Sequence, residues 1–593
     1  MKKGTAASRW ITSVALGLAL LLSGCSGGGG GGSGTTNASV TPLSGTAASG
    51  SPIVGNVLVK DSTGATRSAV IGTAGAYQVD VGGMTPPFLL QAQGLVGNRS
   101  VTMYSAATAA DMGHTVNITP LTDLMVAMVA HAAPGTYFSG GNFAGITDAA
   151  LRDAQSLVQT QLQSVATALG LDPSMDLRHS AFAANHSGMD AMLDLLQETP
   201  ASGNSLTFTN LADGSSFTCN VAMGTFSGTL TAGNVLAYMS TMQQIAGRFS
   251  ALAGFFAAGL PSPANTSLRS LFDQASFMHD GSNLGAFLDA MTADQNFIGM
   301  HFTAINLEQL TSNQARVGYV WQAGGLTRHG EMNLNWSGSQ WLLAGNQHHV
   351  NVALRAASYR PNSMSGGMMM MSSAPRSGLQ LDLSDPGGAG ASYAVMTGPG
   401  LPTTTGGTSG HGAGLLLFRN PSGTFQIAAP GAAYNGPQTP GIASPIDFYA
   451  MSDSFIGNLS DNMPYTVQVY DGTGTLLGSY PMILAKPPHL ASGLASTDFP
   501  VVTMPSNWMM MCQNGGMASL SWTLPSGYAP DELRVEQWGT AGEMTVAYSG
   551  IAGSNMMATM TLPPYSGTLS SSFVWFAGAD IYDRQFGWGG QIQ

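Results

Sequence analysis

One imidazole and two carboxylates recur at intervals of four residues in the segment HSGMDAMLD, as His186, Asp190 and Asp194. On a single α-helix this spacing places all three side chains on one face, where they could bind a metal ion. A helix start explains them without a ligand, because Ser187 and Asp190 have the spacing of a capping box, which leaves His186 outside the helix. The helix dipole also favours an acidic residue there by about 0.3–1 kcal/mol. We therefore predict a capped helix and no metal site.

Two other polar pairs have structural explanations. His348 and His349 fall in a segment predicted to be a strand, where adjacent side chains point to opposite faces and cannot chelate one ion. His279 and Asp280 stand before Gly281, an order typical of a helix end. We assign no chemistry to either pair.

Catalytic motifs are the next candidates, and none is convincing. The pattern G-x-S-x-G occurs at 24–28, beside an apolar leader, where no strand–turn–helix context can form. The segment GHGAGL (410–415) has Leu415 where the third glycine of a dinucleotide fingerprint belongs. H-E-x-x-H, Walker and EF-hand patterns do not occur in the sequence. We predict no enzyme activity and no cofactor.

Methionine is abundant, with 34 residues, and it clusters at Met368–Met371 and in NWMMMCQNGGM (507–517). Thioethers suit Cu(I), so copper binding is one alternative function. Against it, most methionines have the spacing of helical core positions, and neither cluster contains histidine. Methionine as a filler of cores is the preferred interpretation.

Cys25 stands just after an apolar run and just before six consecutive glycines. The basic residues Lys2, Lys3 and Arg9 precede the apolar segment 11–22, which is shorter than the roughly 20 residues that span a bilayer. This order predicts an export signal. A thiol is the most nucleophilic side chain available for alkylation, so Cys25 is the candidate for lipid attachment.

Leu22, Ser23, Gly24 and Cys25 together resemble the lipobox of bacterial lipoproteins. The resemblance implies diacylglycerol on the Cys25 sulfur, cleavage before this residue and acylation of the new amine. Each buried methylene then contributes about 0.8 kcal/mol, and several acyl chains anchor stably. Ser26 stands where an inner-membrane retention aspartate would sit, which favours the outer membrane. The alternative is an ordinary secretory signal with an incidental cysteine.

Composition excludes other classes of protein. The net charge is −12, and without Lys2, Lys3 and Arg9 it is −15, while only four lysines occur in the whole chain. Nucleic-acid binding needs clustered basic residues, so that class is set aside. Charged residues amount to 8%, far below the usual proportion of about 25% for soluble domains. The other two cysteines, Cys219 and Cys512, are predicted to be separate buried thiols.

Short strand patterns dominate residues 43–120, including a turn at Asp61–Gly64. This segment resembles the carboxypeptidase regulatory-like, transthyretin-type domain, which implies an accessory β-sandwich without catalytic residues. The following segment NITPLTDLMVAMV is predicted to close a strand and to open a helix near Pro120. This passage resembles one in surface lipoproteins of β-proteobacteria. The residues that carry the domain resemblance are Val57, Val59, Asp61, Gly64, Thr73, Gly75, Tyr77, Val79 and Val81.

Helical periodicity marks 147–169 and 235–256, with a further helix beginning at Ser187. Residues 263–358 read as helices near 268–278 and 284–291, followed by four strands. This order loosely resembles the nuclear-transport-factor-two-like fold, which often holds a pocket, and a hydrolase with a dispersed site there is the second alternative function. The predicted apolar stripes are Leu151, Ala154, Val158, Leu162, Val165 and Leu169, then Val235, Leu236, Met239, Met242, Ile245, Phe249, Leu252 and Phe256.

The remainder of the chain reads as β-structure. In 490–593, Leu520, Trp522 and Leu524 alternate as in a fibronectin type III or immunoglobulin-like opening. Exposed tryptophans on such a surface could stack on sugars, with FGWGGQ (586–591) as the best candidate, although buried anchors are the default.

The predicted fold is multidomain and mixed, with an N-terminal β-sandwich, a helical and α+β middle, and C-terminal all-β immunoglobulin-like sandwiches. The predicted function is that of a lipid-anchored outer-membrane or surface protein with a binding, adhesion or structural role and a carbohydrate or protein ligand. The predicted segments are 1–24 (signal), 25–42 (lipidated Cys25 and tether), 43–120, 121–262 (mainly helical), 263–358 (α+β), 359–378 (linker), 379–489 and 490–593.

Overall fold

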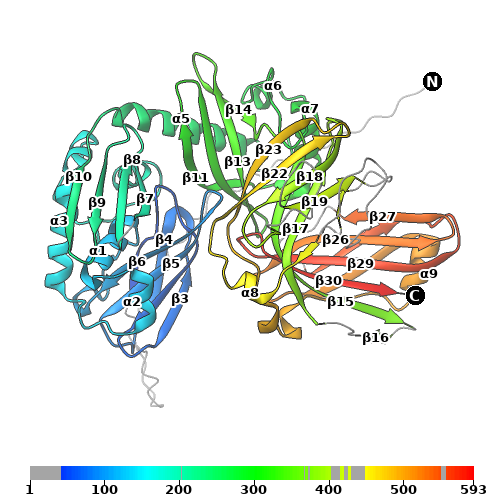
Figure 1. The fold of residues 1–593 in the computed structure, drawn as a ribbon, viewed down its shortest axis with the longest axis horizontal. Helices are drawn as coiled ribbons and strands as arrows, with labels where there is room; N and C mark the ends of the chain where they lie inside the picture. The colour runs from blue at the N-terminus through cyan, green and yellow to red at the C-terminus, as the bar shows by residue number, and fades with distance from the viewer. Residues whose placement is uncertain are drawn as a thin grey trace, which may run out of the picture. The chain divides into compact units, whose positions relative to one another are not determined.

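The computed structural model describes residues 42–201, 204–365, 368–370, 374–402, 414–419, 425–428, 448–548 and 556–592. Within these residues the chain is a large mixed α/β protein of several sheets, mostly antiparallel, and none of the sheets closes into a barrel (Figure 1). No helix in the described segments has the length and apolar character needed to cross a membrane.

Residues 42–107 form two small antiparallel sheets around one apolar core, consistent with the predicted β-sandwich. The predicted turn is present: Asp61 Oδ1 accepts hydrogen bonds from the backbone of Thr63 and Ala65, both at 2.9 Å, and Gly64 has a φ of +91°. Strands β1 and β4 pair, and the second sheet has the order β3-β2-β5-β6. The strands are β1 (Pro42–Thr46), β2 (Val54–Asp61), β3 (Thr66–Val70), β4 (Ala76–Asp80), β5 (Phe88–Val96) and β6 (Arg99–Ala107).

The helix predicted near Pro120 is α1, where Thr119 and Thr122 form a capping box and Pro120 occupies the first turn. The periodic segments 147–169 and 235–256 are α3 and α5, as predicted. In α5, however, Leu236 is 67% exposed and lies outside the buried stripe. The helices of this region are α1 (Pro120–Ala130), α2 (Pro134–Gly140), α3 (Asp148–Ala168), α4 (Met189–Asp194) and α5 (Val235–Phe256).

Between α4 and α5 lies a four-stranded antiparallel sheet that the sequence does not predict. Its strands are short and rich in threonine and serine, so they lack a clear alternation of apolar and polar residues. Phe208 and Phe217 stack within this sheet with ring centroids 5.2 Å apart. The sheet has the order β10-β9-β8-β7, from β7 (Leu196–Ala201), β8 (Ser205–Asn210), β9 (Ser216–Asn220) and β10 (Thr225–Thr229).

The four strands predicted after 297 form an antiparallel meander, against which α5 packs. The predicted helix 268–278 is wrong, because α6 ends at Arg269 and the side chain of Asp273 then accepts hydrogen bonds from the backbone of Ala275 and Ser276. The elements are α6 (Thr266–Arg269), α7 (Leu284–Ala293), β11 (His301–Leu310), β12 (Gln314–Ala323), β13 (Leu326–Trp336) and β14 (Trp341–Gly345). This meander and α1, α3 and α5 contribute to a single apolar core.

The largest sheet joins distant parts of the chain (Figure 1). Strand β15 pairs antiparallel with β17 and parallel with β30, so part of the predicted linker 359–378 lies in a strand. The sheet has the order β21-β17-β15-β30-β29-β26-β27, and β16 pairs with β15. Its strands are β15 (Asn351–Ser365), β16 (Met368–Met370), β17 (Arg376–Ser384), β21 (Phe448–Ala450), β26 (Ala529–Gly539), β27 (Gly542–Tyr548), β29 (Leu569–Ala579) and β30 (Gln585–Ile592).

Two smaller antiparallel sheets complete the C-terminal half, with orders β20-β19-β18-β22-β23 and β24-β25-β28. The predicted alternation in β25 is confirmed, since Leu520 and Trp522 are buried between exposed neighbours. Further elements are β18 (Ala391–Thr397), β19 (Leu415–Arg419), β20 (Phe425–Ile427), β22 (Met463–Asp471), β23 (Leu476–Leu484), β24 (Val501–Thr503), β25 (Gly516–Thr523), β28 (Met557–Leu562), α8 (Asp453–Ile456) and α9 (Trp508–Asn514). Short 3-10 turns lie at Thr73–Gly75, Ala109–Asp111, Gln295–Phe297, Ala491–Gly493 and Ser496–Asp498.

Candidate metal centre

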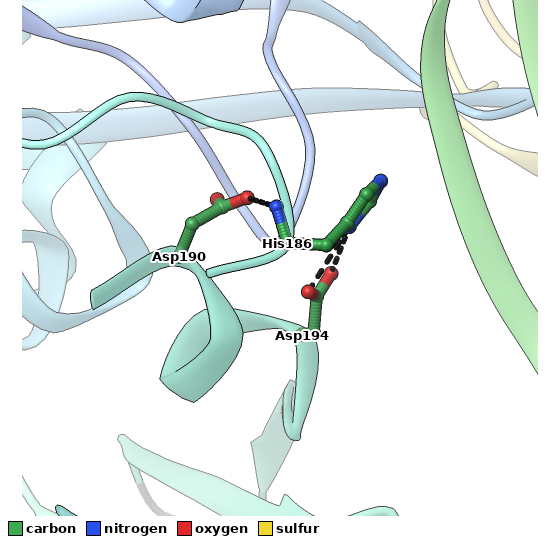
Figure 2. Close-up of side chains that lie close together, drawn as sticks. All are labelled: His186, Asp190 and Asp194. Atoms are coloured by element: carbon green, nitrogen blue, oxygen red, sulfur yellow. Dashed lines mark hydrogen bonds and ion pairs between the residues drawn. The ribbon is translucent and has the colours of Figure 1, made fainter. Parts of the chain in front are cut away.

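The three residues spaced four apart meet in space. Figure 2 shows Asp190 and Asp194 on α4, with His186 in the loop before it. One potential ligand atom of each residue lies within 4.8 Å of those of the other two. Although the spacing was visible in the sequence, one side chain comes from a loop, so the three do not share a helix face.

His186 contacts both carboxylates in different ways. Its ring Nδ1 lies 3.1 Å from Oδ1 and 3.0 Å from Oδ2 of Asp194. Its backbone N–H donates to Oδ2 of Asp190 at 2.6 Å. The imidazole therefore faces Asp194, while Asp190 holds the backbone of the same residue (Figure 2).

The predicted capping box at Ser187 is wrong, although His186 does lie outside the helix. The cap residue of α4 is Gly188, and no side chain caps this helix. His186 and Gly188 have φ values of +62° and +59°, which turn the chain so that Asp190 reaches the N–H of His186 instead. The hydroxyl of Ser187 donates to Oδ1 of Asn185 at 2.6 Å.

Burial dominates the electrostatics of the cluster. Asp190 is fully buried, and its Oδ1 has no hydrogen-bond partner among the described residues. Burial raises the pKa of Asp194 to about 7, although His186 opposes the shift, and burial also raises the pKa of Asp190. For His186, burial opposes protonation, but the hydrogen bond and the charges of the two carboxylates raise its pKa overall.

Three separate parts of the chain support the cluster. Gly50, between β1 and β2, has a φ of +74°, and a Cβ there would lie 2.9 Å from both Cα and Oδ1 of Asp194. Gln243 of α5 donates through Nε2 to the carbonyl of His186 at 3.4 Å. The N–H of Ala184 donates to the carbonyl of Ala74 at 3.1 Å. The cluster thus lies where the sandwich, the 178–188 loop and α5 meet.

A second group of imidazoles and carboxylates lies in the α+β region. His348 is buried in the connection between β14 and β15, not in the predicted strand, because the chain turns through Gln347 at a φ of +64°. Its Nδ1 is 3.7 Å from Oδ1 of Asp280, and its Nε2 is 3.5 Å from Oε1 of Glu331. Imidazole–carboxylate contacts thus link the β14–β15 connection to β13 and to the connection between α6 and α7.

The predicted helix end at His279–Gly281 is wrong as well. His279 and Ser282 close a tight turn through backbone hydrogen bonds of 3.0 and 2.8 Å, and Asp280 and Gly281 have φ values of +49° and +76°. Burial lowers the pKa of His279. No serine hydroxyl in the described segments forms a hydrogen bond with this group.

A third network, which the sequence does not reveal, joins the 172–180 loop to the end of the sandwich. His179 lies 2.8 Å from Asp111 through Nε2 and 2.9 Å from Asp176 through Nδ1, and Arg178 contacts Asp111 at 2.6 Å. The hydrogen bonds to Asp111 and Asp176 raise the pKa of His179 to about 9. Burial opposes ionisation of Asp111, but His179 and Arg178 outweigh it and lower its pKa to about 2.

This network predicts a pH dependence of thermal stability. The raised pKa of His179 contributes stability that is complete below 6.5 and is lost as the pH rises towards 9. The lowered pKa of Asp111 contributes stability that is complete above 3.8 and is lost as the pH falls towards 2. His179→Gln is expected to abolish part of the decline in melting temperature between pH 6.5 and 9. His301→Gln, at an exposed position, is expected to retain that decline. An unchanged slope in the His179 variant would contradict this assignment.

The remaining predicted residues have mixed outcomes. Cys219 and Cys512 are buried free thiols, as predicted, and burial raises the pKa of Cys219 to about 11. The prediction of an exposed aromatic in the FGWGGQ segment is wrong. Trp588 of β30 is 2% exposed because its ring packs into an apolar core. Cys25 with its lipobox residues, and His411 of GHGAGL, lie outside the described residues.

The methionine clusters are described only in part. Met368–Met370 form β16, and Met371 lies outside the described residues. In the second cluster the Cys512 thiol donates to the hydroxyl of Ser572 at 3.6 Å, and burial raises its pKa. A protonated, buried thiol is a poor ligand for copper.

By its fold the chain is a large multi-sheet mixed α/β protein whose antiparallel sheets are consistent with β-sandwich domains. No known protein family matches it, and no curated protein is detectably similar to it in sequence.

Proposed function

We propose that the protein is a lipid-anchored envelope or surface protein with a non-catalytic binding, adhesion or structural role. The observation that carries the proposal is the order of basic residues, short apolar segment and Leu22-Ser23-Gly24-Cys25. The lipobox-type cysteine would carry the acyl chains, and the outer membrane would be the site of anchoring. A carbohydrate or another protein would be the ligand.

The glycine-rich sequence after Cys25 supports this proposal. The described residues begin at Pro42, and strand β1 pairs with β4 from there to Thr46. Glycine-rich linkers of about 17 residues have a root-mean-square span of about 20–25 Å. Such a tether would hold the body near the headgroups while leaving its surfaces free to bind.

The first test is the N-terminal mass of the protein after expression in a bacterium that processes lipoproteins. The wild-type chain is expected to begin at Cys25 with acyl chains attached and to partition into detergent. Cys25→Ser is expected to retain residues 1–24, because cleavage depends on the modified cysteine, while Ser26→Ala is expected to behave like the wild type. An unmodified Cys25 in the wild-type protein would overturn the proposal.

A second measurement separates the periplasmic face from the cell surface. Protease added to intact cells is expected to digest the body if it faces outward and to leave it intact if it faces the periplasm. A protease-sensitive result with intact outer membranes would favour adhesion or capture of an external ligand.

A further inference from the structure

We propose that His186, Asp190 and Asp194 bind one divalent transition-metal ion. This proposal does not depend on the proposed lipid anchor. The three potential ligand atoms lie within 4.8 Å of one another. Metal bonds of about 2.0–2.2 Å place neighbouring ligand atoms about 3 Å apart in octahedral geometry and about 3.5 Å apart in tetrahedral geometry. The separations of 3.0 and 3.1 Å between the His186 ring and Asp194 lie at the short end of this range.

The burial of two carboxylates beside one imidazole favours a bound cation. Asp190 is fully buried, and the side chain of Asp194 is 5% exposed. Burying an ionised carboxylate without a counter-charge is costly in a protein interior. One imidazolium can neutralise the negative charge of only one of the two carboxylates, whereas a divalent cation neutralises both charges.

The contacts around the three side chains resemble the outer shell of a metal site. The His186 N–H orients Asp190 through Oδ2, which is the carboxylate oxygen that faces the other two side chains, while Oδ1 points away from them (Figure 2). The backbone at Gly50 packs against Asp194, and Gln243 holds the carbonyl of His186. Such outer contacts fix ligand orientation in metalloproteins and increase affinity.

The donor set indicates the chemical class of the ion. One imidazole nitrogen and two carboxylate oxygens suit Zn²⁺, Mn²⁺ or Fe²⁺, whereas Ca²⁺ prefers six to eight oxygens and Cu(I) prefers sulfur. Three protein ligands would leave a coordination position for water. Because the sandwich, the loop and α5 meet here, the bound ion would also link these three parts of the chain.

The test uses the full-length protein in detergent after removal of metals with a chelator. Equilibrium dialysis with Zn²⁺ is expected to show one site that His186→Asn and Asp190→Asn each weaken by at least about 100-fold, because loss of an outer-shell contact alone costs 10–100-fold. His301→Asn and Asp289→Asn are matched controls at exposed positions and are expected to bind like the wild type. Ca²⁺ in tenfold excess is expected not to displace Zn²⁺.

Two further measurements guard against a variant that fails to fold. Binding of Co²⁺ to the wild-type chain is expected to produce visible absorption bands, and Zn²⁺ is expected to remove them and to raise the melting temperature. Circular dichroism checks each variant before dialysis. Absence of Zn²⁺ binding to the wild type at micromolar concentration, wild-type affinity in both ligand variants, or equal competition by Ca²⁺ would overturn the proposal.

Discussion

Replacing Asp531 by asparagine is expected to lower the free energy of unfolding by about 3–5 kcal/mol, because it leaves the half-buried Arg328 without its counter-charge and Arg355 with Asp583 alone. The carboxylate of Asp531 forms ion pairs with Arg328 of β13 and, at 3.3 Å, with Arg355 of β15. Arg355 also lies 2.9 Å from Asp583, and Gln585 donates to Asp531. The Asp531 side chain is 5% exposed and those of Arg328 and Arg355 are 22% and 25% exposed, so water replaces only part of the lost counter-charge.

Urea unfolding followed by tryptophan fluorescence measures this effect. Asp80→Asn is the matched control, because its ion pair with Arg67 is roughly half exposed on both sides and such pairs contribute at most about 1 kcal/mol. The urea midpoint of Asp80→Asn is expected to shift no more than ordinary surface substitutions shift it. Equal effects of the two substitutions would mean that the buried network around Asp531 does not stabilise the junction of β13, β15 and β26.

The sequence predicts the long periodic helices, but it does not predict the short strands or the pairing of distant strands. The bounds of α3 and α5 follow from the 3.6-residue repeat of apolar side chains, which local sequence encodes directly. The sheet between α4 and α5 was missed because its strands span five or six residues and carry many hydroxyl side chains. The parallel pairing of β15 with β30 joins segments more than 200 residues apart, which no local pattern can reveal.

The candidate site shows the same division between local and distant information. The spacing of His186, Asp190 and Asp194 identified the residues, but their geometry depends on two residues with positive φ that reverse the chain before α4. The contact of Gly50 with Asp194 is equally invisible in the sequence. Long-range contacts of this kind also determine which histidines are paired, as with His179 and Asp111.

Phe249→Ala tests whether the helical and α+β regions unfold together. Phe249 of α5 is fully buried, and its ring lies 4.8 Å from that of Phe302 and 5.7 Å from that of Tyr319, centroid to centroid. Truncating a buried phenylalanine removes transfer energy and leaves a cavity, so a loss of about 3–5 kcal/mol is expected. Because both contacts are on the β11–β12 meander, the two regions should lose stability in one common transition.

The control for this prediction lies on the same helix. Leu236→Ala removes an apolar side chain that the sequence pattern also assigns to the buried stripe, but Leu236 is 67% exposed. Its effect is therefore expected to remain within about 0.5 kcal/mol. Hydrogen exchange then distinguishes the outcomes: in the Phe249 variant, amides of α5 and of β11 should lose protection together. Loss of protection in α5 alone would mean that the two regions fold as separate units despite their shared core.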